Sequence, residues 1–326
     1  MKASPSAHGP LPRATGIVET LSAGFGVVNQ QPWIVVIPVL LDLFLLFGPR
    51  LSASPLVSWF VSQPAFERSL GAGAAPEAAQ AELIALADDL NVLALLSAGG
   101  ISLPSVVPLL GVARGPLIMV GTVGRVVLCG LGALALGALL GCVYRALLAQ
   151  GARDGEIAPL HVPAEAGRGW MRIIVLALLL IGAMLVLLVP LAFVAALASL
   201  VAAGAAALVT GVVVTVALAA QLYLFFAPDA IFISRVGPIE AIRRSIAVVH
   251  TGIWSALTFV MLVTVTLIGM AQVWALLASQ AGWGLSLAIV GNAYIASGLI
   301  AASMVFYQER MDVLLAQRAV IAASEA

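Results

Sequence analysis

Long apolar runs alternate with short charged segments along the whole chain. A bilayer core about 30 Å thick is crossed by about twenty apolar residues in a helix, so each run can be compared with that length. The pattern predicts an all-α, polytopic membrane protein with six transmembrane helices. The predicted spans are 31–48, 126–145, two within 172–227, 253–278 and 284–306.

The third and fourth spans come from a single run of 56 uncharged residues between Arg172 and Asp229. That length accommodates two crossings and the turn between them. The turn falls either after Pro190 or near Gly204. We favour the Ala-rich stretch between these two positions.

The segment 50–125, predicted to lie outside the cell, is long for a simple connection. Residues 76–96 combine acidic side chains with spaced leucines, which predicts an amphipathic helix over the outer surface. The run LLSAGGISLPSVVPLL (95–110) is apolar but broken by glycines and prolines. We therefore expect a re-entrant or surface-lying element there rather than a seventh crossing.

A short charged helix precedes the fifth span. In GPIEAIRRSIAVVHTGIW (237–254), Ile239, Ile242, Ile246 and Val249 fall on one helical side, while the arginines point elsewhere. This pattern predicts an interfacial helix, or elbow, that turns the chain into the membrane. Its expected anchors are Arg243 and Arg244 in the headgroup layer and Trp254 at the start of the span.

A similar segment precedes the first span at a displacement of 221 positions. The coinciding residues are Gly16, Glu19 and Trp33 with Gly237, Glu240 and Trp254. We therefore predict two elbows, one in the cytoplasmic segment 1–30 and one in the cytoplasmic loop 228–252, with Trp33 as a further anchor. Trp170 and the segment 155–169 suggest a weaker third copy, which would give three units of elbow plus helical hairpin.

The stretch PDAIFISRVGPIEAIRRS (228–245), followed by a polar turn and a span, resembles a bacterial six-span integral membrane family of unknown function. That family is similar to the membrane domain fused to some glycerophosphodiester phosphodiesterases. The resemblance covers about residues 227–268 and implies six helices with surface elbows. It brings no catalytic residues. Since the chain contains no soluble phosphodiesterase region, we do not expect that activity.

Composition and charge agree with a membrane protein. Only 9% of the residues are charged and the mean hydropathy is +1.13, whereas soluble domains carry about 25% charged residues. The net charge is zero, which excludes the basic surface that nucleic-acid binding requires. With both termini in the cytoplasm, eleven of the fifteen Lys and Arg residues lie inside. We expect a multi-pass protein of the inner (plasma) membrane, with cytoplasmic segments 146–171 and 307–326.

Four polar residues are expected in the outer half of the spans: Asp42, Arg125, Gln272 and Asn292. A carboxylate inside a membrane is costly unless it is paired or protonated. One interpretation is that Asp42 pairs with Arg125, or is protonated, and that the amides bond neighbouring helices. The other is that Asp42 is a proton or cation site in a transport pathway.

Small residues recur every four positions in the second span: Cys129, Ala133, Gly137 and Gly141. Such a stripe allows close approach of another element, either within the chain or across a homodimer. The second cysteine, Cys142, is thirteen residues from Cys129 in the same helix, about 20 Å away, so no disulfide joins them.

No motif for catalysis, for a metal or for a cofactor occurs in the sequence. We therefore expect a non-enzymatic membrane scaffold or partner subunit, with a lipid-accessible cavity and no cofactor. The alternative is a small transporter or permease component that uses Asp42. The expected partners are the lipid bilayer and either other membrane proteins or a second copy of the chain, but not nucleic acid.

Overall fold

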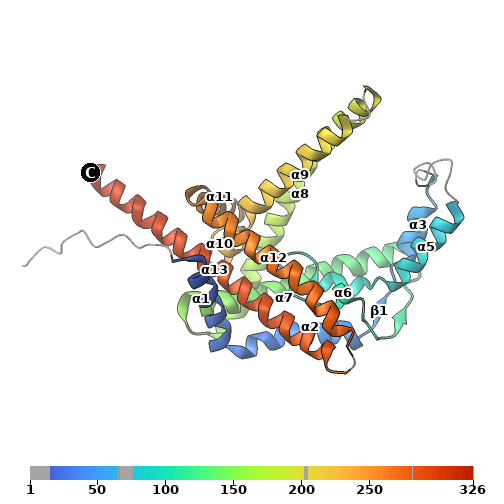
Figure 1. The fold of residues 1–326 in the computed structure, drawn as a ribbon, viewed down its shortest axis with the longest axis horizontal. Helices are drawn as coiled ribbons and strands as arrows, with labels where there is room; N and C mark the ends of the chain where they lie inside the picture. Colours follow the sequence, from blue (N-terminus) through green and yellow to red (C-terminus); the bar gives the residue numbers. More distant parts are fainter. Residues whose placement is uncertain (1–14, 65, 67–75, 202–204, 281, 326) are drawn as a thin grey trace, which may run out of the picture. The chain divides into compact units, whose positions relative to one another are not determined.

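A computed structural model of the protein describes residues 15–64, 66, 76–201, 205–280 and 282–325. The described chain is almost entirely helical, which confirms the all-α prediction (Figure 1). Its α-helices are α1 (Ile17–Gln30), α2 (Val36–Phe47), α3 (Ser54–Val61), α5 (Pro76–Asp89), α6 (Val107–Leu110), α7 (Val123–Asp154), α8 (Val162–Val201), α9 (Ala205–Leu224), α10 (Ala227–Ile233), α11 (Pro238–Thr251), α12 (Ile253–Ala278) and α13 (Gly284–Glu325).

Short elements complete the described chain. Three 3₁₀ helices are present, η1 (Pro32–Val35), η2 (Val92–Ser97) and η3 (Pro159–His161). Two strands of two residues, β1 (Arg50–Leu51) and β2 (Leu117–Ile118), pair in parallel, with Arg50 opposite Leu117. The predicted amphipathic helix at 76–96 is therefore shorter than expected, because α5 ends at Asp89 and η2 follows.

Five helices in the described residues are long and apolar enough to cross a membrane. They are α7, α8 with η3, α9 with α10, α12 and α13. A sixth span results if α1 and Pro32–Phe47, which are bent by 89°, count together. The predicted six-span, polytopic architecture agrees with this count.

Several helices continue beyond the predicted membrane spans. The predicted loop 146–171 is mostly helix, since α7 extends to Asp154 and α8 begins at Val162. The predicted tail 307–326 is helical to Glu325. α8 passes through Pro190 and ends at Val201. α9 begins at Ala205, so the predicted turn between the third and fourth spans falls on residues 202–204, outside the described residues, as do residues 1–14 of the predicted tail.

The chain divides into two compact units. Unit 1 contains the described parts of 1–29, 148–265 and 298–326. Its core includes three phenylalanine rings, with centroids 5.0 Å apart for Phe226 and Phe306 and 4.4 Å apart for Phe259 and Phe306. Beside them Tyr307 and Ser234 share a hydrogen bond of 2.8 Å. This aromatic cluster joins the end of α9, α12 and α13 within the unit.

The two predicted elbows are present in unit 1 and match residue for residue. α1 and α11 each have 14 residues, and both their first and last residues are 221 positions apart. Their buried faces also coincide: Thr20, Gly24 and Val28 in α1 match Ala241, Ser245 and Val249 in α11. The internal repeat predicted from the sequence is therefore present in the structure.

Each elbow packs through the middle residue of its buried face. A Cβ on Gly24 would collide with the backbone of Ala302 in α13, so only glycine fits this approach. At the matching position, the Ser245 hydroxyl donates to the carbonyl of Tyr223 in α9 at 2.6 Å. Small residues thus seat both elbows against membrane-length helices.

The predicted third elbow is wrong as a separate helix. α8 runs without a break from Val162, through Trp170, to Val201. Only the single turn η3 precedes it. α8 stays helical through Gly169 and Arg172 into its apolar run, whereas α11 ends at Thr251 and is followed by Gly252 before the next span.

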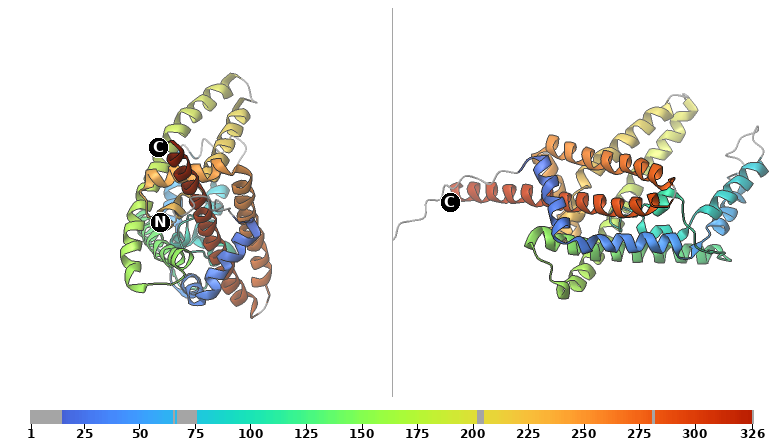
Figure 2. Two further views of the ribbon diagram at one scale, coloured as in Figure 1. Left: turned by 90° about the vertical axis from the view of Figure 1, so that its left-hand side faces the viewer. Right: turned by 60° about the horizontal axis from the view of Figure 1, so that its bottom comes forward.

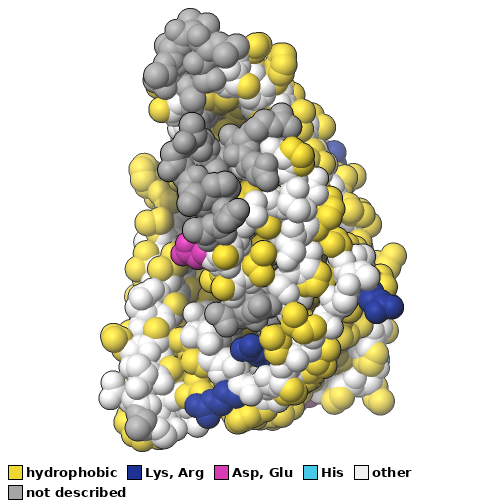
Figure 3. Space-filling model, turned by 90° about the vertical axis from the view of Figure 1, so that its right-hand side faces the viewer, with side chains coloured by type: hydrophobic (Ala, Val, Ile, Leu, Met, Phe, Trp, Pro, Cys, Tyr) yellow, Lys and Arg dark blue, Asp and Glu magenta, His cyan; other side chains and the backbone are white. Residues whose placement is uncertain are grey.

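The α8–α9 hairpin supports the assignment to a membrane. The 20-residue α9 packs against part of the 40-residue α8 (Figures 1 and 2). Large apolar side chains are exposed along it, for example Val186, Phe193 and Leu208 at 77%, 66% and 76%. Figure 3 shows a surface on which hydrophobic side chains predominate and charged ones are sparse. A helix that is apolar all round is expected in lipid and not in water.

Unit 2 contains residues 30–147 and 266–297. Its central feature is the segment 92–110, which we name the α7-bound hairpin. It begins with η2, reverses direction at Gly99 (φ +84°), and ends with α6. Gly137 and Gly141 of α7 lie against the backbone of Leu96 and Ile101, where a Cβ would collide. The Arg145 guanidinium donates to the carbonyl of Gly100 at 2.6 Å.

These contacts place the hairpin along much of α7. Leu95 lies near Gly130, and the tip is bound by Arg145, fifteen residues further on, which is about 22 Å along a helix. In a membrane-length helix this stretch lies at membrane depth, where irregular backbone is tolerated only if protein or water covers it. The arrangement supports the re-entrant alternative, and no described helix in 50–122 is long enough for a seventh crossing.

Candidate functional site: an arginine cleft

Three charged residues share one face at the amino-terminal end of α8. Glu165, Arg168 and Arg172 are separated by three and four positions, the spacing that brings side chains together on a helix. Their helix begins at Val162, directly after η3, whose last residue is His161. This face therefore presents two guanidinium groups and a carboxylate near the predicted cytoplasmic end of the third span.

α10 and the turn after it form the opposite wall. Gly169 allows the close approach, because a Cβ at this position would collide with the ring of Phe232 in α10. After α10 ends, Arg235 adopts φ 54°, a left-handed conformation uncommon for a residue other than glycine. The guanidinium of Arg172 donates to the carbonyl of Arg235 at 2.8 Å. The turn is thereby fixed by the opposite wall.

Glu165 is the centre of a polar network. It pairs with the guanidinium of Arg235, lies 3.7 Å from that of Arg153, and accepts a hydrogen bond of 3.0 Å from the amide of Gln150. Arg153 also pairs with Asp154 at 2.6 Å. These contacts link the end of α7 to α8 and to the turn after α10.

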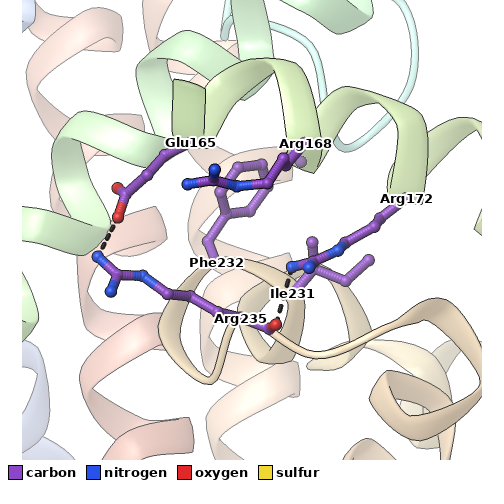
Figure 4. Close-up of a pocket in the computed structure, with 7 residues that line it drawn as sticks. Glu165, Arg168, Arg172, Ile231, Phe232 and Arg235 are labelled. Carbon is purple, nitrogen blue, oxygen red and sulfur yellow. Dashed lines mark hydrogen bonds and ion pairs between the residues drawn. The ribbon is translucent and has the colours of Figure 1, made fainter. Parts of the chain in front are cut away.

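The arginine cleft is the hollow between these walls. One part has a volume of 320 Å³ and is lined by His161, Ala164, Glu165, Arg168 and Arg235. A smaller part of 40 Å³ continues past Gly169 to Arg172, Ile231 and Phe232. Figure 4 shows Glu165 joined to Arg235, the Arg168 side chain beside this pair and pointing toward Glu165, and Arg172 on the far side of Phe232.

The cleft has an excess of positive charge. Four guanidinium groups, those of Arg153, Arg168, Arg172 and Arg235, are set against the carboxylates of Asp154 and Glu165. Arg168 is exposed and makes no hydrogen bond or ion pair with the described residues. Its guanidinium therefore remains available to an anion that enters the hollow. Arginine suits phosphate because its planar group presents several N–H donors at once.

The polar groups of the cleft are mostly hydrogen-bond donors. Its polar groups are guanidinium donors, one carboxylate already engaged by them, and the exposed imidazole of His161. Among the described residues, no group of three His, Cys, Asp or Glu side chains is placed to hold a metal ion. Neither a hydroxyl nor a thiol lines the two hollows.

Sequence reasoning counted Arg168, Arg172 and Arg235 as inside charges but did not group them. The signal was present in the spacing of Glu165, Arg168 and Arg172, which predicts one helical face if α8 begins before residue 165. The predicted loop 146–171 concealed this face. The partnership with Arg235 depends on tertiary packing and has no local signal.

Asp42 is the most buried of the four predicted polar residues, with no exposed surface. Its carboxylate accepts hydrogen bonds from the Ser105 hydroxyl and from the backbone N–H groups of Val106, at 3.0 Å, and Val107, at 3.1 Å. Asp42 thereby holds the returning arm of the α7-bound hairpin against α2.

The predicted cluster around Asp42 is not formed. Arg125 and Gln272 are exposed, and Asn292 is half-buried. Asp42 pairs with the 105–107 turn and not with Arg125, because the hairpin offers donors directly beside α2. The prediction gave 95–110 as a re-entrant or surface-lying element but did not place it beside Asp42, and therefore missed these donors.

Three of the four predicted anchor residues have exposed side chains, as expected for an interface. Trp33 and Trp254 are 46% and 77% exposed, and Arg243 is also exposed. Arg244 is half-buried and pairs with Glu240 at 3.0 Å. The predicted apolar side of α11 is not buried as a whole. Ile239 and Ile246 are exposed, Ile242 is half-buried, and Val249 is buried. The small-residue face packs on protein and leaves isoleucines free for lipid.

The small-residue stripe packs within the chain. Gly137 and Gly141 receive the backbone of the α7-bound hairpin, Ala133 is buried, and Cys129 is half-buried. Of the two predicted uses, close packing inside the chain is therefore the one that the structure contains. The same contact uses the surface that a homodimer would have needed.

Comparison of the chain with protein-family models, with curated proteins and with solved structures finds no match. The proposals below are therefore based on the geometry of the molecule.

Proposed function

We propose that this is a non-enzymatic, multi-pass membrane protein that binds anionic lipid headgroups in the arginine cleft. The observation that carries the proposal is Arg168, an exposed guanidinium without a described partner, beside two further arginines. Basic pockets between membrane helices on the cytoplasmic side are suited to phosphate-containing headgroups. The proposal keeps the predicted scaffold or partner-subunit role and specifies the lipid-accessible site.

The predicted orientation supports this placement. With cytoplasmic termini and an inner-membrane location, the beginning of α8 and the turn after α10 belong to the cytoplasmic leaflet. The exposed isoleucines of α11 lie on the next helix after that turn and suit the same interface. An anionic lipid would then place its phosphate at Arg168 and its chains along the apolar surface of α8.

The rival proposal, a transporter that uses Asp42, has less support. A transport carboxylate needs access to a cavity, whereas Asp42 is fully buried and engaged by three donors. Association with other membrane proteins, or with a second copy of the chain, stays a prediction. The same holds for the resemblance to the six-span family.

The test compares Arg168→Gln with Arg318→Gln. Arg318 is an exposed arginine of α13 outside the cleft and is also predicted to be cytoplasmic, so both changes remove one charge. In nanodiscs, we expect the wild type and Arg318→Gln to bind cardiolipin or phosphatidylglycerol equally. Arg168→Gln should bind about fivefold more weakly, since one basic residue near a membrane contributes about 1 kcal/mol.

The controls separate a specific site from general charge attraction. Phosphatidylcholine should not compete for the cleft, and Arg168→Lys should retain most of the binding. Because Arg168 makes no described bond, its removal leaves the Glu165 network intact. Equal weakening by both glutamine variants, measured by native mass spectrometry, would contradict the proposal.

A further inference from the structure

A second hollow lies in unit 2. It has a volume of 370 Å³ and is bounded by α2, by η2 and α6 of the α7-bound hairpin, and by the loop at 111–113. Most of its wall is apolar, contributed by Leu45, Leu90, Val107 and Pro108. Its size is within the range of pockets for small organic ligands.

Among the described residues, Arg50 is the only charged one that lines this hollow. Its Nε atom is buried and has no hydrogen-bond partner, while one terminal nitrogen lies 3.5 Å from the carbonyl of Ala113. None of the described carboxylates forms an ion pair with it. The other terminal nitrogen makes no hydrogen bond with the described residues, so its N–H groups can donate to an acceptor in the hollow.

Asn91 is the second polar group on the wall. Its Oδ1 atom accepts hydrogen bonds of 3.0 Å from the backbone N–H groups of Leu51 and Leu93, which fixes the amide. The carbonyl oxygen is thereby occupied, and the side chain offers only its N–H₂ group as a further hydrogen-bond donor. Arg50 and Asn91 therefore present donors and no acceptor to the hollow.

We propose that this hollow binds a single-chain anionic amphiphile. A carboxylate or phosphate head would accept hydrogen bonds from Arg50 and Asn91, and an apolar chain would lie along Leu45, Val107 and Pro108. The donor-only polar groups select the negative head, and the apolar wall selects the chain. This site does not depend on the arginine cleft, which is built from residues of the other unit.

The experiment measures binding of decanoate and of decyl phosphate to the full chain in a neutral detergent, by equilibrium dialysis. Decanol is the matched neutral control for the chain alone. We expect one saturable site for at least one of the two anions, with decanol at least tenfold weaker. Preference for decanoate would indicate a fatty-acid source, and preference for decyl phosphate a lysophospholipid-like source.

Variants locate the site. Arg50→Gln should weaken anion binding at least tenfold, whereas Arg114→Gln, an exposed arginine nearby in sequence, should not change it. The β1–β2 pairing uses the backbone of Arg50 and survives the change. Ala94→Phe fills the hollow without removing charge and should also abolish binding. A wild-type thermal midpoint in this variant would show that the loss comes from the filled hollow and not from misfolding.

Two results would overturn the proposal. The first is that neither anion binds the wild type more tightly than decanol does. The second is that Arg50→Gln and Ala94→Phe, both with wild-type thermal midpoints, bind the anion as the wild type does.

Discussion

At the scale of single residues, Asp42 shows how a carboxylate that is unfavourable inside a span can stabilise the contact between two segments. Its carboxylate receives three donors from residues 105–107, two of them backbone N–H groups. Those N–H groups have no helical partner of their own, because α6 begins only at Val107. The carboxylate thus satisfies the start of a short helix that lipid could not solvate.

We predict that Asp42→Asn lowers the thermal unfolding midpoint in detergent, equivalent to about 2 kcal/mol, because an amide accepts more weakly than a carboxylate. Ser105→Ala removes only one donor and should cost about 1 kcal/mol. The exposed Gln272→Ala is the neutral control. A stable Asp42→Asn variant that has lost a proton or cation flux in proteoliposomes would instead favour the transporter.

The importance of Asp42 could be predicted from the sequence, but its partner could not. A lone carboxylate in an apolar run indicates a paired or functional group from composition alone. Its partners are 63 to 65 positions away and are mostly backbone atoms. Backbone N–H donors cannot be recognised from residue types. The predicted pairing of Asp42 with Arg125 was based on the opposite charge and is wrong.

At the scale of elements, packing through small residues explains which helix faces are buried. The elbows use Gly24 and Ser245, and α7 uses Gly137 and Gly141. The repeat was visible in the sequence because Gly, Glu and Trp coincide between the two elbows. The length of α8 was not visible, because its first ten residues contain Pro, Gly and charges that are also typical of a loop.

For α7 we predict that Gly137→Ala and Gly141→Ala each destabilise the protein by about 1–3 kcal/mol, since the added methyl group meets the hairpin backbone. The matched control is Gly132→Ala in the same helix, where the added atom meets nothing within 4 Å. That change should be neutral, or stabilising by up to about 1 kcal/mol. Three equal thermal midpoints would mean that the hairpin does not pack on α7.

At the scale of the whole molecule, the re-entrant hairpin fixes the sidedness of everything after it. If 92–110 leaves the membrane on the side from which it entered, four crossings separate α1 from α11. Both elbows then lie at the same leaflet, as the charge distribution predicts. A seventh crossing in this segment would place the elbows on opposite sides and would move the arginine cleft away from the leaflet of α1.

The elbows supply a matched pair of positions for this test. Ser22 and Arg243 are 221 positions apart, and both are exposed on the elbow helices. In a background with Cys129 and Cys142 replaced by alanine, Ser22→Cys and Arg243→Cys should react with an impermeant maleimide only when the inner face is accessible. Ser279→Cys, in the turn between α12 and α13, should react in intact cells.

Opposite labelling of the two elbow cysteines would show that the hairpin crosses the membrane. Labelling of both from outside would leave the hairpin re-entrant but reverse the predicted orientation. Opposite labelling would therefore contradict the re-entrant hairpin. Either result would contradict a cytoplasmic assignment, that of the arginine cleft or that of α1.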